Sequence, residues 1–287
     1  MESITEKKQI ELADMATLIR EDIVKMLVEA GSGHSAGSLG MADIFATLYF
    51  GDVLRHDPQN PLWEERDRLV LSNGHICPVL YATLARAGYL PLDELTTLRD
   101  FRSRLQGHPH RENLPGVETT SGPLGSGLSQ ASGMAYAARL DGAKWRVYCL
   151  LSDGEHDEGN TWEAVMFAAK YKLNNLTAII DRNNIQIDGY TEDVMPLNSL
   201  ATKYEAFNWH VIEIDGHDYG AIKDACDEAS SVADRPTVIV ARTIPGKDIE
   251  YMENLPEWHG KSPNVGEAIE ALRELRTLQG KIEAEYD

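Results

Sequence analysis

Two polar segments in the middle of the chain carry side chains that could hold a metal ion. Asp153-Gly154 follows the apolar run 147–151, and Asn183-Asn184 follows the largely apolar run 176–180. Neighbouring parallel strands end at one edge of a sheet, so we expect Asp153 and Asn183 to converge there. A carboxylate, an amide oxygen and a nearby main-chain carbonyl suit Mg²⁺ or Ca²⁺, with phosphate oxygens and water completing the shell. Asp-Gly and Asn-Asn are also common turn dipeptides, so the pattern alone leaves both interpretations open.

Alternating apolar strands and helices are predicted to position these side chains. We expect strands at 67–72, 146–151, 176–181, 210–215 and 237–242, with helices at 161–171 and 219–230. Continuous apolar strands separated by helices are typical of a mainly parallel sheet with helices on both faces. The sequence therefore predicts a three-layer α/β fold whose ligands bind outside the carboxyl ends of the strands.

Further helices are predicted around this alternation. The apolar spacing indicates helices at 5–30, 40–51, 129–140 and 266–285, and another between His75 and Arg86. The stretch 106–127 is irregular and rich in Gly, His and Pro. Because no repeat or interdomain linker is evident, we expect residues 1–287 to form a single domain with an N-terminal helical segment and a C-terminal helix.

Composition excludes several classes of partner. The formal net charge is -19, with 27 Lys and Arg against 46 Asp and Glu, and no basic run that would bind nucleic acid. No stretch has the length and apolarity of a membrane span, and residues 1–23 lack the apolar core of a signal peptide. Three cysteines without close spacing indicate neither zinc nor disulfides, so we expect a cytoplasmic protein.

The segment 147–189 resembles the thiamine diphosphate signature, in which a strand ends in Gly-Asp-Gly and a second strand about thirty residues later ends in Asn or Asn-Asn. Ser152 stands where the family usually has the first Gly. Five further segments resemble transketolase motifs and occur in the transketolase order, namely 31–35, 71–75, 107–109, 122–127 and 258–260. This resemblance to the transketolase family implies a thiamine-diphosphate-binding fold of the diphosphate-binding (PP) type.

The resemblance covers essentially the whole chain but only the first half of a full-length transketolase. The pyrimidine-binding half, which carries the activating glutamate, has no counterpart in this sequence. The resemblance therefore implies the N-terminal subunit of a two-chain transketolase, which moves a two-carbon ketol unit between sugar phosphates, pentose phosphates by default. We expect a C-terminal partner subunit to supply the pyrimidine-binding half-site, and an α2β2 heterotetramer by analogy with the family dimer.

The same resemblance implies roles for individual residues. The metal ligands would be Asp153, Asn183 and the main-chain carbonyl of Ile185. The cofactor would contact Asp153, Asn183, His75, Gly122, Pro123, Leu124, Gly154, Glu155, Ile187 and His259. The donor hydroxyls would meet His34 and His108, with His75 and His259 near the diphosphate or the substrate. Imidazole suits this work because ketol transfer moves protons on sugar oxygens near neutral pH. Glu158 resembles the interface glutamate that connects the two active sites of a dimer.

Other histidines and one departure from the family complete the expectations. We assign no site role to His56, His110, His156, His210 and His217. Pro245 stands where some relatives place a lysine near the diphosphate, and Lys247 is the candidate replacement.

Two other functions compete with this interpretation. The alpha subunit of a 2-oxo acid dehydrogenase also splits its thiamine diphosphate site between chains, but a 2-oxo acid offers no row of hydroxyls for four histidines. A non-catalytic module with the same fold would have no need of intact metal ligands.

Overall fold

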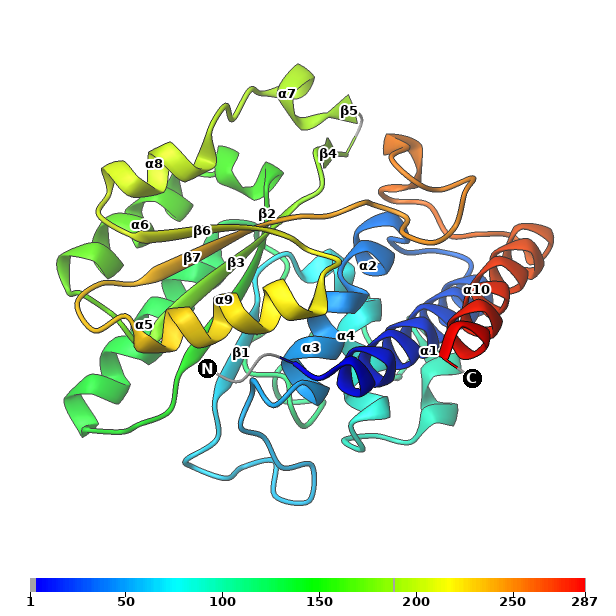
Figure 1. Cartoon of the computed structure of the whole chain (residues 1–287), viewed down its shortest axis with the longest axis horizontal. Helices are drawn as coiled ribbons and strands as arrows, with labels where there is room; N and C mark the ends of the chain where they lie inside the picture. The colour runs from blue at the N-terminus through cyan, green and yellow to red at the C-terminus, as the bar shows by residue number, and fades with distance from the viewer. Residues whose placement is uncertain (1–3, 188, 287) are drawn as a thin grey trace.

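A five-stranded, fully parallel sheet forms the centre of the computed structural model, which describes residues 4–187 and 189–286 (Figure 1). The strand order is β1-β2-β3-β7-β6, with bounds Arg68–Leu71, Val147–Ser152, Leu176–Arg182, Thr237–Arg242 and His210–Asp215. Every predicted strand agrees with an observed one to within one residue at each end. The prediction of a parallel sheet is confirmed.

Helices cover both faces of the sheet (Figure 1). Successive strand residues point to opposite faces, and both faces carry apolar side chains that must be covered. Tyr148 and Leu150 face one layer, which contains α1 (Glu6–Ala30), α3 (Ala42–Phe50), α4 (Cys77–Arg86), α9 (Tyr219–Ser231) and α10 (Val265–Tyr286). Cys149 and Leu151 face the other layer, which contains α5 (Ser126–Asp141), α6 (Gly159–Lys170) and α8 (Leu200–Ala206). The three-layer prediction is therefore confirmed. In the described part of the chain, no helix has the length and apolarity needed to cross a membrane.

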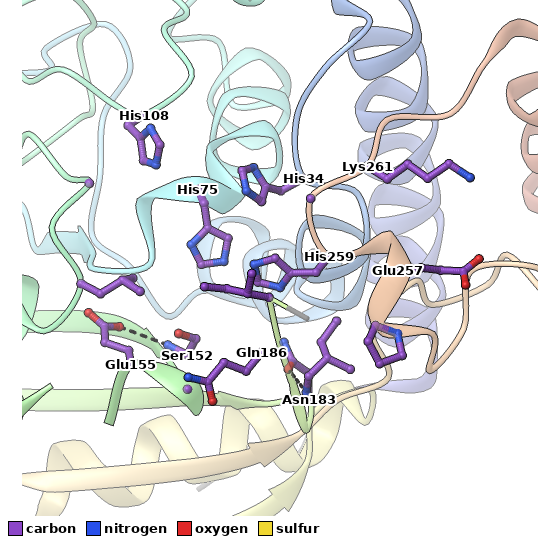
Figure 2. Close-up of a pocket in the computed structure, with 18 residues that line it drawn as sticks. His34, His75, His108, Ser152, Glu155, Asn183, Gln186, Glu257, His259 and Lys261 are labelled. Carbon is purple, nitrogen blue, oxygen red and sulfur yellow. Dashed lines mark hydrogen bonds between the residues drawn. The ribbon is translucent and has the colours of Figure 1, made fainter. Parts of the chain in front are cut away.

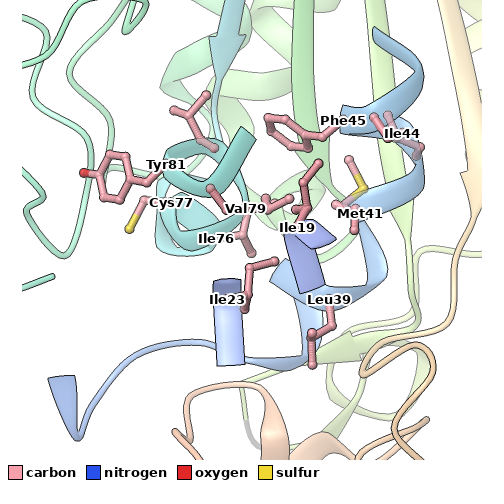
Figure 3. Packing of buried hydrophobic residues seen from close by; sticks show 14 of the residues in the cluster. Ile19, Ile23, Leu39, Met41, Ile44, Phe45, Ile76, Cys77, Val79 and Tyr81 are labelled. Carbon is pink, nitrogen blue, oxygen red and sulfur yellow. The ribbon is translucent and has the colours of Figure 1, made fainter. Parts of the chain in front are cut away.

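The N-terminal helices meet in a buried apolar cluster beside the sheet (Figure 3). Ile19 and Ile23 of α1 pack there with Leu39 of the short helix α2 (Ala36–Gly40). The Arg20 guanidinium, itself buried, donates to the Leu39 carbonyl at 3.2 Å and pairs with Asp43 of α3. These contacts fix the turn between α1 and α2, which carries His34. The helix predicted over 40–51 is correct for α3, but α2 precedes it and was not predicted.

Short elements at the carboxyl edge of the sheet also differ from the prediction. β4 (Ile185–Gln186) and β5 (Gly189–Tyr190) form an antiparallel hairpin, followed by α7 (Thr191–Val194). Short 3-10 helices occur at Gly74–Ile76 (η1), Leu92–Thr97 (η2), Gly154–Asp157 (η3) and Pro256–Trp258 (η4). Single hydrogen bonds hold such turns, for example Thr191 N–H to the Asn184 carbonyl at 3.0 Å, so apolar periodicity does not reveal them.

Candidate active site

A cavity of about 700 Å³ lies at the carboxyl ends of β2 and β3. It gathers segments that are distant in sequence, and Figure 2 shows their side chains. The site residues predicted from sequence that line it are His34, His75, His108, Gly122, Leu124, Gly154, Glu155, Asn183, Ile185, Ile187 and His259. The position therefore agrees with the rule that ligands bind outside the carboxyl ends of parallel strands.

Three imidazole rings form a close triangle in this cavity. The ring centroids lie 5.1 Å apart for His34–His75, 5.5 Å for His34–His259 and 5.1 Å for His75–His259. Burial lowers the pKa of His34 to about 4 and the pKa of His75 well below its ordinary value, and the neighbouring imidazoles act in the same direction. Burial and Arg99 lower the pKa of His108. Neutral imidazoles result, and each neutral ring offers one N–H donor and one acceptor nitrogen.

Two hydrogen bonds fix the turn of His34 and join it to the segment of His259. The Ser38 hydroxyl donates to the His34 carbonyl at 2.7 Å, and the Ser35 hydroxyl donates to the Lys261 carbonyl at 2.5 Å. The second bond joins the turn of His34 directly to the segment that carries His259. The triangle of rings therefore depends on contact between chain segments more than two hundred residues apart.

The Asp153 carboxylate lies at the end of β2 and is completely buried. Its Oδ1 accepts a hydrogen bond from Gly154 N–H at 2.7 Å. Its Oδ2 accepts from Arg182 Nη1 at 2.8 Å, from Asn184 N–H at 2.7 Å and from the Thr191 hydroxyl at 3.3 Å. Burial raises the pKa of Asp153, while the Arg182 guanidinium opposes that rise.

The Asn183 amide is oriented by its neighbours on β3 and β4. Its Nδ2 donates to Asp181 Oδ2 at 2.8 Å, so its Oδ1 points to the other side, where it accepts from Ile185 N–H at 3.0 Å. The oxygens of Asp153, Asn183 and the Ile185 carbonyl form a set with the chemistry that a hard cation prefers. Among the described residues, no three or more His, Cys, Asp or Glu side chains are grouped in a way that suits a metal ion. The proposed set is of a different kind, because it has one carboxylate, one amide oxygen and one main-chain carbonyl.

Glu155 joins three strand and helix ends beneath the cavity. Its Oε1 accepts from the Ser72 hydroxyl and from Gly125 N–H at 2.7 Å, and its Oε2 accepts from Ser152 N–H at 3.2 Å. Ser72 in turn accepts from Gly127 N–H at 3.0 Å. Burial raises the pKa of Glu155 to about 7. Glu155 thus fixes the 122–127 loop, whose Gly122 and Leu124 line the cavity.

Some predicted residues lie apart from the cavity wall. Pro123 and Asp153 are not among the lining residues. Asp153 is buried between Ser152 and Gly154, which both line the cavity. Glu158 is exposed at the start of α6. Its predicted role at the interface of a dimer therefore stays a prediction, which needs a second chain in contact with this surface. Lys247, the candidate replacement for a lysine of the family, lines a different cavity and pairs with Asp248 at 3.0 Å, so it is not among the residues that line this one.

Several residues of the site were missed by sequence reasoning. Gln186 lines the cavity and its Nε2 donates to Asp157 at 2.9 Å, while Lys261 follows the Trp-His-Gly motif and lies over the Trp258 ring. His156, to which no role was assigned, is buried beneath Asp153 and donates from Nδ1 to the Ser152 and Asp153 carbonyls. The sequence signal for His156 was its position directly after Glu155, within the motif that begins at Asp153. The sequence does not show whether the His156 side chain points toward the cavity or into the core.

Comparison with known proteins decides the family. Residues 11–281 match the sequence profile described as "Transketolase, thiamine diphosphate binding domain". The chain belongs to the transketolase family. It is 42% identical over 247 residues to the 6-deoxy-6-sulfo-D-fructose transketolase subunit SqwG of Clostridium sp. (strain MSTE9), covering 86% of this chain and 90% of that protein. It is 40% identical to an apulose-4-phosphate transketolase subunit of Phocaeicola vulgatus, covering 93% and 94%.

Solved transketolase structures share the fold. The transketolase from Leishmania mexicana superposes with a TM-score of 0.85 at 32% identity, over 96% of this chain but 45% of that one. The transketolase from Campylobacter jejuni gives a TM-score of 0.83 at 32% identity, over 98% and 48%. The expected fold and family are confirmed, and the chain is a transketolase-type thiamine diphosphate enzyme subunit. The 2-oxo acid dehydrogenase interpretation is not favoured.

Proposed function

We propose that this transketolase subunit carries the diphosphate half of a site that moves a two-carbon ketol unit from a ketose to an aldose, and that it does so only together with a partner subunit. The observation that carries this proposal is that four histidines line one cavity together with Asn183 and Ile185 of the oxygen set. Figure 2 shows the four histidines and Asn183 around this cavity. One side of this cavity suits a cation-bound diphosphate, and the other suits a row of sugar hydroxyls.

Thiamine diphosphate would be held through a divalent cation on Asp153, Asn183 and the Ile185 carbonyl, with Mg²⁺ and Ca²⁺ both compatible with these oxygens. When bound, the cofactor supplies the electron sink for breaking a carbon–carbon bond beside a carbonyl. Leu124 and Ile187 offer apolar surface to its rings. Such a cation explains how a chain with a formal charge of -19 holds an anionic cofactor.

The histidines would bind and deprotonate sugar hydroxyls. Because burial keeps His34 and His75 neutral, each can accept a proton from a hydroxyl and return it later in the cycle. Two relatives are named for a sulfosugar and a sugar phosphate, which supports a ketose with an anionic group as the donor class.

The partner would supply the pyrimidine-binding half-site. Support comes from the relatives named as subunits, of which this chain covers 90% and 94%, whereas it covers only 42% of human transketolase. We further propose an α2β2 assembly in which Glu158 lies at the contact between sites, and a cytoplasmic location.

The decisive assay is ketol transfer from xylulose 5-phosphate to ribose 5-phosphate with thiamine diphosphate and Mg²⁺. We expect no turnover by this chain alone and turnover after mixing with the partner subunit; robust turnover by the purified chain alone would exclude the two-chain proposal. In the assembled enzyme, Asp153→Ala should abolish cation-dependent cofactor binding measured by calorimetry. The matched control is Asp224→Ala, an exposed aspartate of α9 that should leave binding unchanged.

A further inference from the structure

Arg182, the last residue of β3, joins two carboxylates beside the candidate cation site. Its Nη1 donates to Asp153 Oδ2 at 2.8 Å, and its Nη2 donates to Glu192 Oε1 at 2.5 Å. The Arg182 side chain is 20% exposed and the Asp153 side chain is fully buried. A planar guanidinium that uses two different N–H groups fixes the direction of its partners, which a single ammonium does not.

The two oxygens of Asp153 have different surroundings. Oδ2 accepts three hydrogen bonds, from Arg182, Asn184 and Thr191, which exceeds its two lone pairs. Oδ1 accepts one hydrogen bond from a described residue, Gly154 N–H. Oδ1 is therefore the oxygen with a lone pair left for a cation, and the donors on Oδ2 prevent the carboxylate from rotating.

Glu192 braces the guanidinium from the other side. Its Oε2 accepts from Asn198 N–H at 3.1 Å, so the carboxylate is tied to the chain that follows α7. The Arg182–Glu192 pair has no net charge. Glu192 therefore offsets part of the positive charge that Arg182 brings to the neighbourhood of a divalent cation.

We propose that Arg182, braced by Glu192, is a positioning residue that holds Asp153 with Oδ1 presented to the divalent cation. This inference rests on the proposed function, because that function assigns a cation to Asp153. Arg182 acts through Asp153 and not on the cofactor or the substrate. Its loss should therefore raise the Mg²⁺ concentration that is needed and leave kcat at saturating Mg²⁺ close to that of the parent enzyme.

The test compares Arg182→Gln and Arg182→Lys in the enzyme assembled with its partner. Loss of a side chain that orients a metal ligand typically weakens metal binding about 10- to 100-fold. We expect an increase of that size in the KM for Mg²⁺ of Arg182→Gln, an equal weakening of Mg²⁺-dependent thiamine diphosphate binding by calorimetry, and an intermediate value for Arg182→Lys. Unchanged Mg²⁺ dependence in Arg182→Gln, or a loss confined to kcat, would overturn the inference.

The chain offers a matched control in Arg242. It pairs in register with Arg182 on the adjacent strand β7, but its side chain is exposed and bonds only Glu213 among the described residues, at 3.2 Å. Arg242→Gln should leave Mg²⁺ dependence unchanged, and an equal loss in this variant would overturn the inference.

Two further comparisons keep the outcomes separate. If Arg182→Gln does not fold, as judged by circular dichroism, Glu192→Gln replaces it, with a smaller loss expected in the same direction and no loss overturning the inference. If the parent enzyme binds thiamine diphosphate equally well without a divalent cation, the proposed cation site on Asp153 fails, and the inference about Arg182 fails with it, whereas the ketol-transfer assay tests the two-chain function separately.

Discussion

At the scale of the single residue, burial decides the protonation state of His34 in the cavity. Its folded-state pKa of about 4 lies below the ordinary 6.5, and its Nδ1 is buried without a hydrogen-bond partner among the described residues. Between these two pH values the unfolded chain binds the proton and the folded chain does not. The stability present above pH 6.5 is therefore lost as the pH falls towards 4.

His34→Asn should remove this dependence, because asparagine does not titrate. Between pH 7 and 5 we expect the wild-type chain to lose on the order of 1 kcal/mol more unfolding free energy than the variant, a value reduced because the side chain is partly exposed. Urea denaturation at a series of pH values measures it. Titrating groups that do not contact His34 cancel in the difference, and the loss of the contribution that His34 makes to lowering the pKa of His75 acts in the same direction as the predicted effect. Parallel stability curves, or an imidazole NMR resonance of His34 that titrates near pH 6.5, would contradict the prediction.

At the scale of the element, the start of α5 is held against the end of β1 by a glycine. A Cβ added at Gly127 would lie 2.4 Å from Ser72 Cβ and 2.6 Å from Ser72 Cα. Ser72 also accepts from Gly127 N–H and donates to Glu155. Any shift of α5 would therefore pass through Ser72 and Glu155 to the loop that lines the cavity.

Gly127→Ala should destabilise the chain by about 1 to 3 kcal/mol, the usual cost of overpacking. It should also weaken thiamine diphosphate binding. Gly133→Ala is the control in the same helix, because nothing lies within 4 Å of the added Cβ. That change should stabilise the chain by about 0.5 to 1 kcal/mol, since alanine favours a helix over glycine. Denaturant midpoints of the two variants on the same side of the parent would argue against close packing at Gly127.

Sequence predicted the elements that depend on apolar patterns and missed those that depend on individual bonds. The strands ending at Ser152 and Arg182 are apolar over most of their length. The convergence of Asp153 and Asn183 was therefore expected from a parallel sheet, in which neighbouring strands end at one edge. α8 escaped prediction because it has seven residues, which start where the Ser199 side chain accepts from Thr202 N–H. Seven residues are too few to show the 3.6-residue apolar period by which longer helices are recognised.

The same distinction holds in the candidate site. The histidines stand beside glycines in recognisable motifs, and the cavity contains all four of them. Arg182 had no such motif, because its contact with Glu192 exists only after the β4–β5 hairpin has turned the chain back. The orientation of Asp153 therefore had to come from the structure.

At the scale of the whole molecule, exposed apolar side chains gather beside the cavity. Ile187, Tyr190, Val194 and Met195 are between 43% and 62% exposed. They belong to the hairpin, to α7 and to the residue directly after α7, and the hairpin and α7 project together from the edge of the sheet (Figure 1). Such groups mark contact surfaces, whereas scattered ones need no explanation. The formal charge of -19 opposes association of identical chains.

Salt acts differently on these two forces, and this difference gives the last prediction. Without its partner the chain should self-associate at high concentration, and added salt should strengthen the association because it screens the repulsion and leaves apolar contact intact. Sedimentation velocity measures this. Val194→Lys with Met195→Lys should shift the chain towards monomer without lowering its unfolding free energy, because both side chains are exposed. Addition of the partner chain should replace self-association with a defined complex. A chain that stays monomeric at high protein and salt concentration would show that these side chains do not form a contact surface.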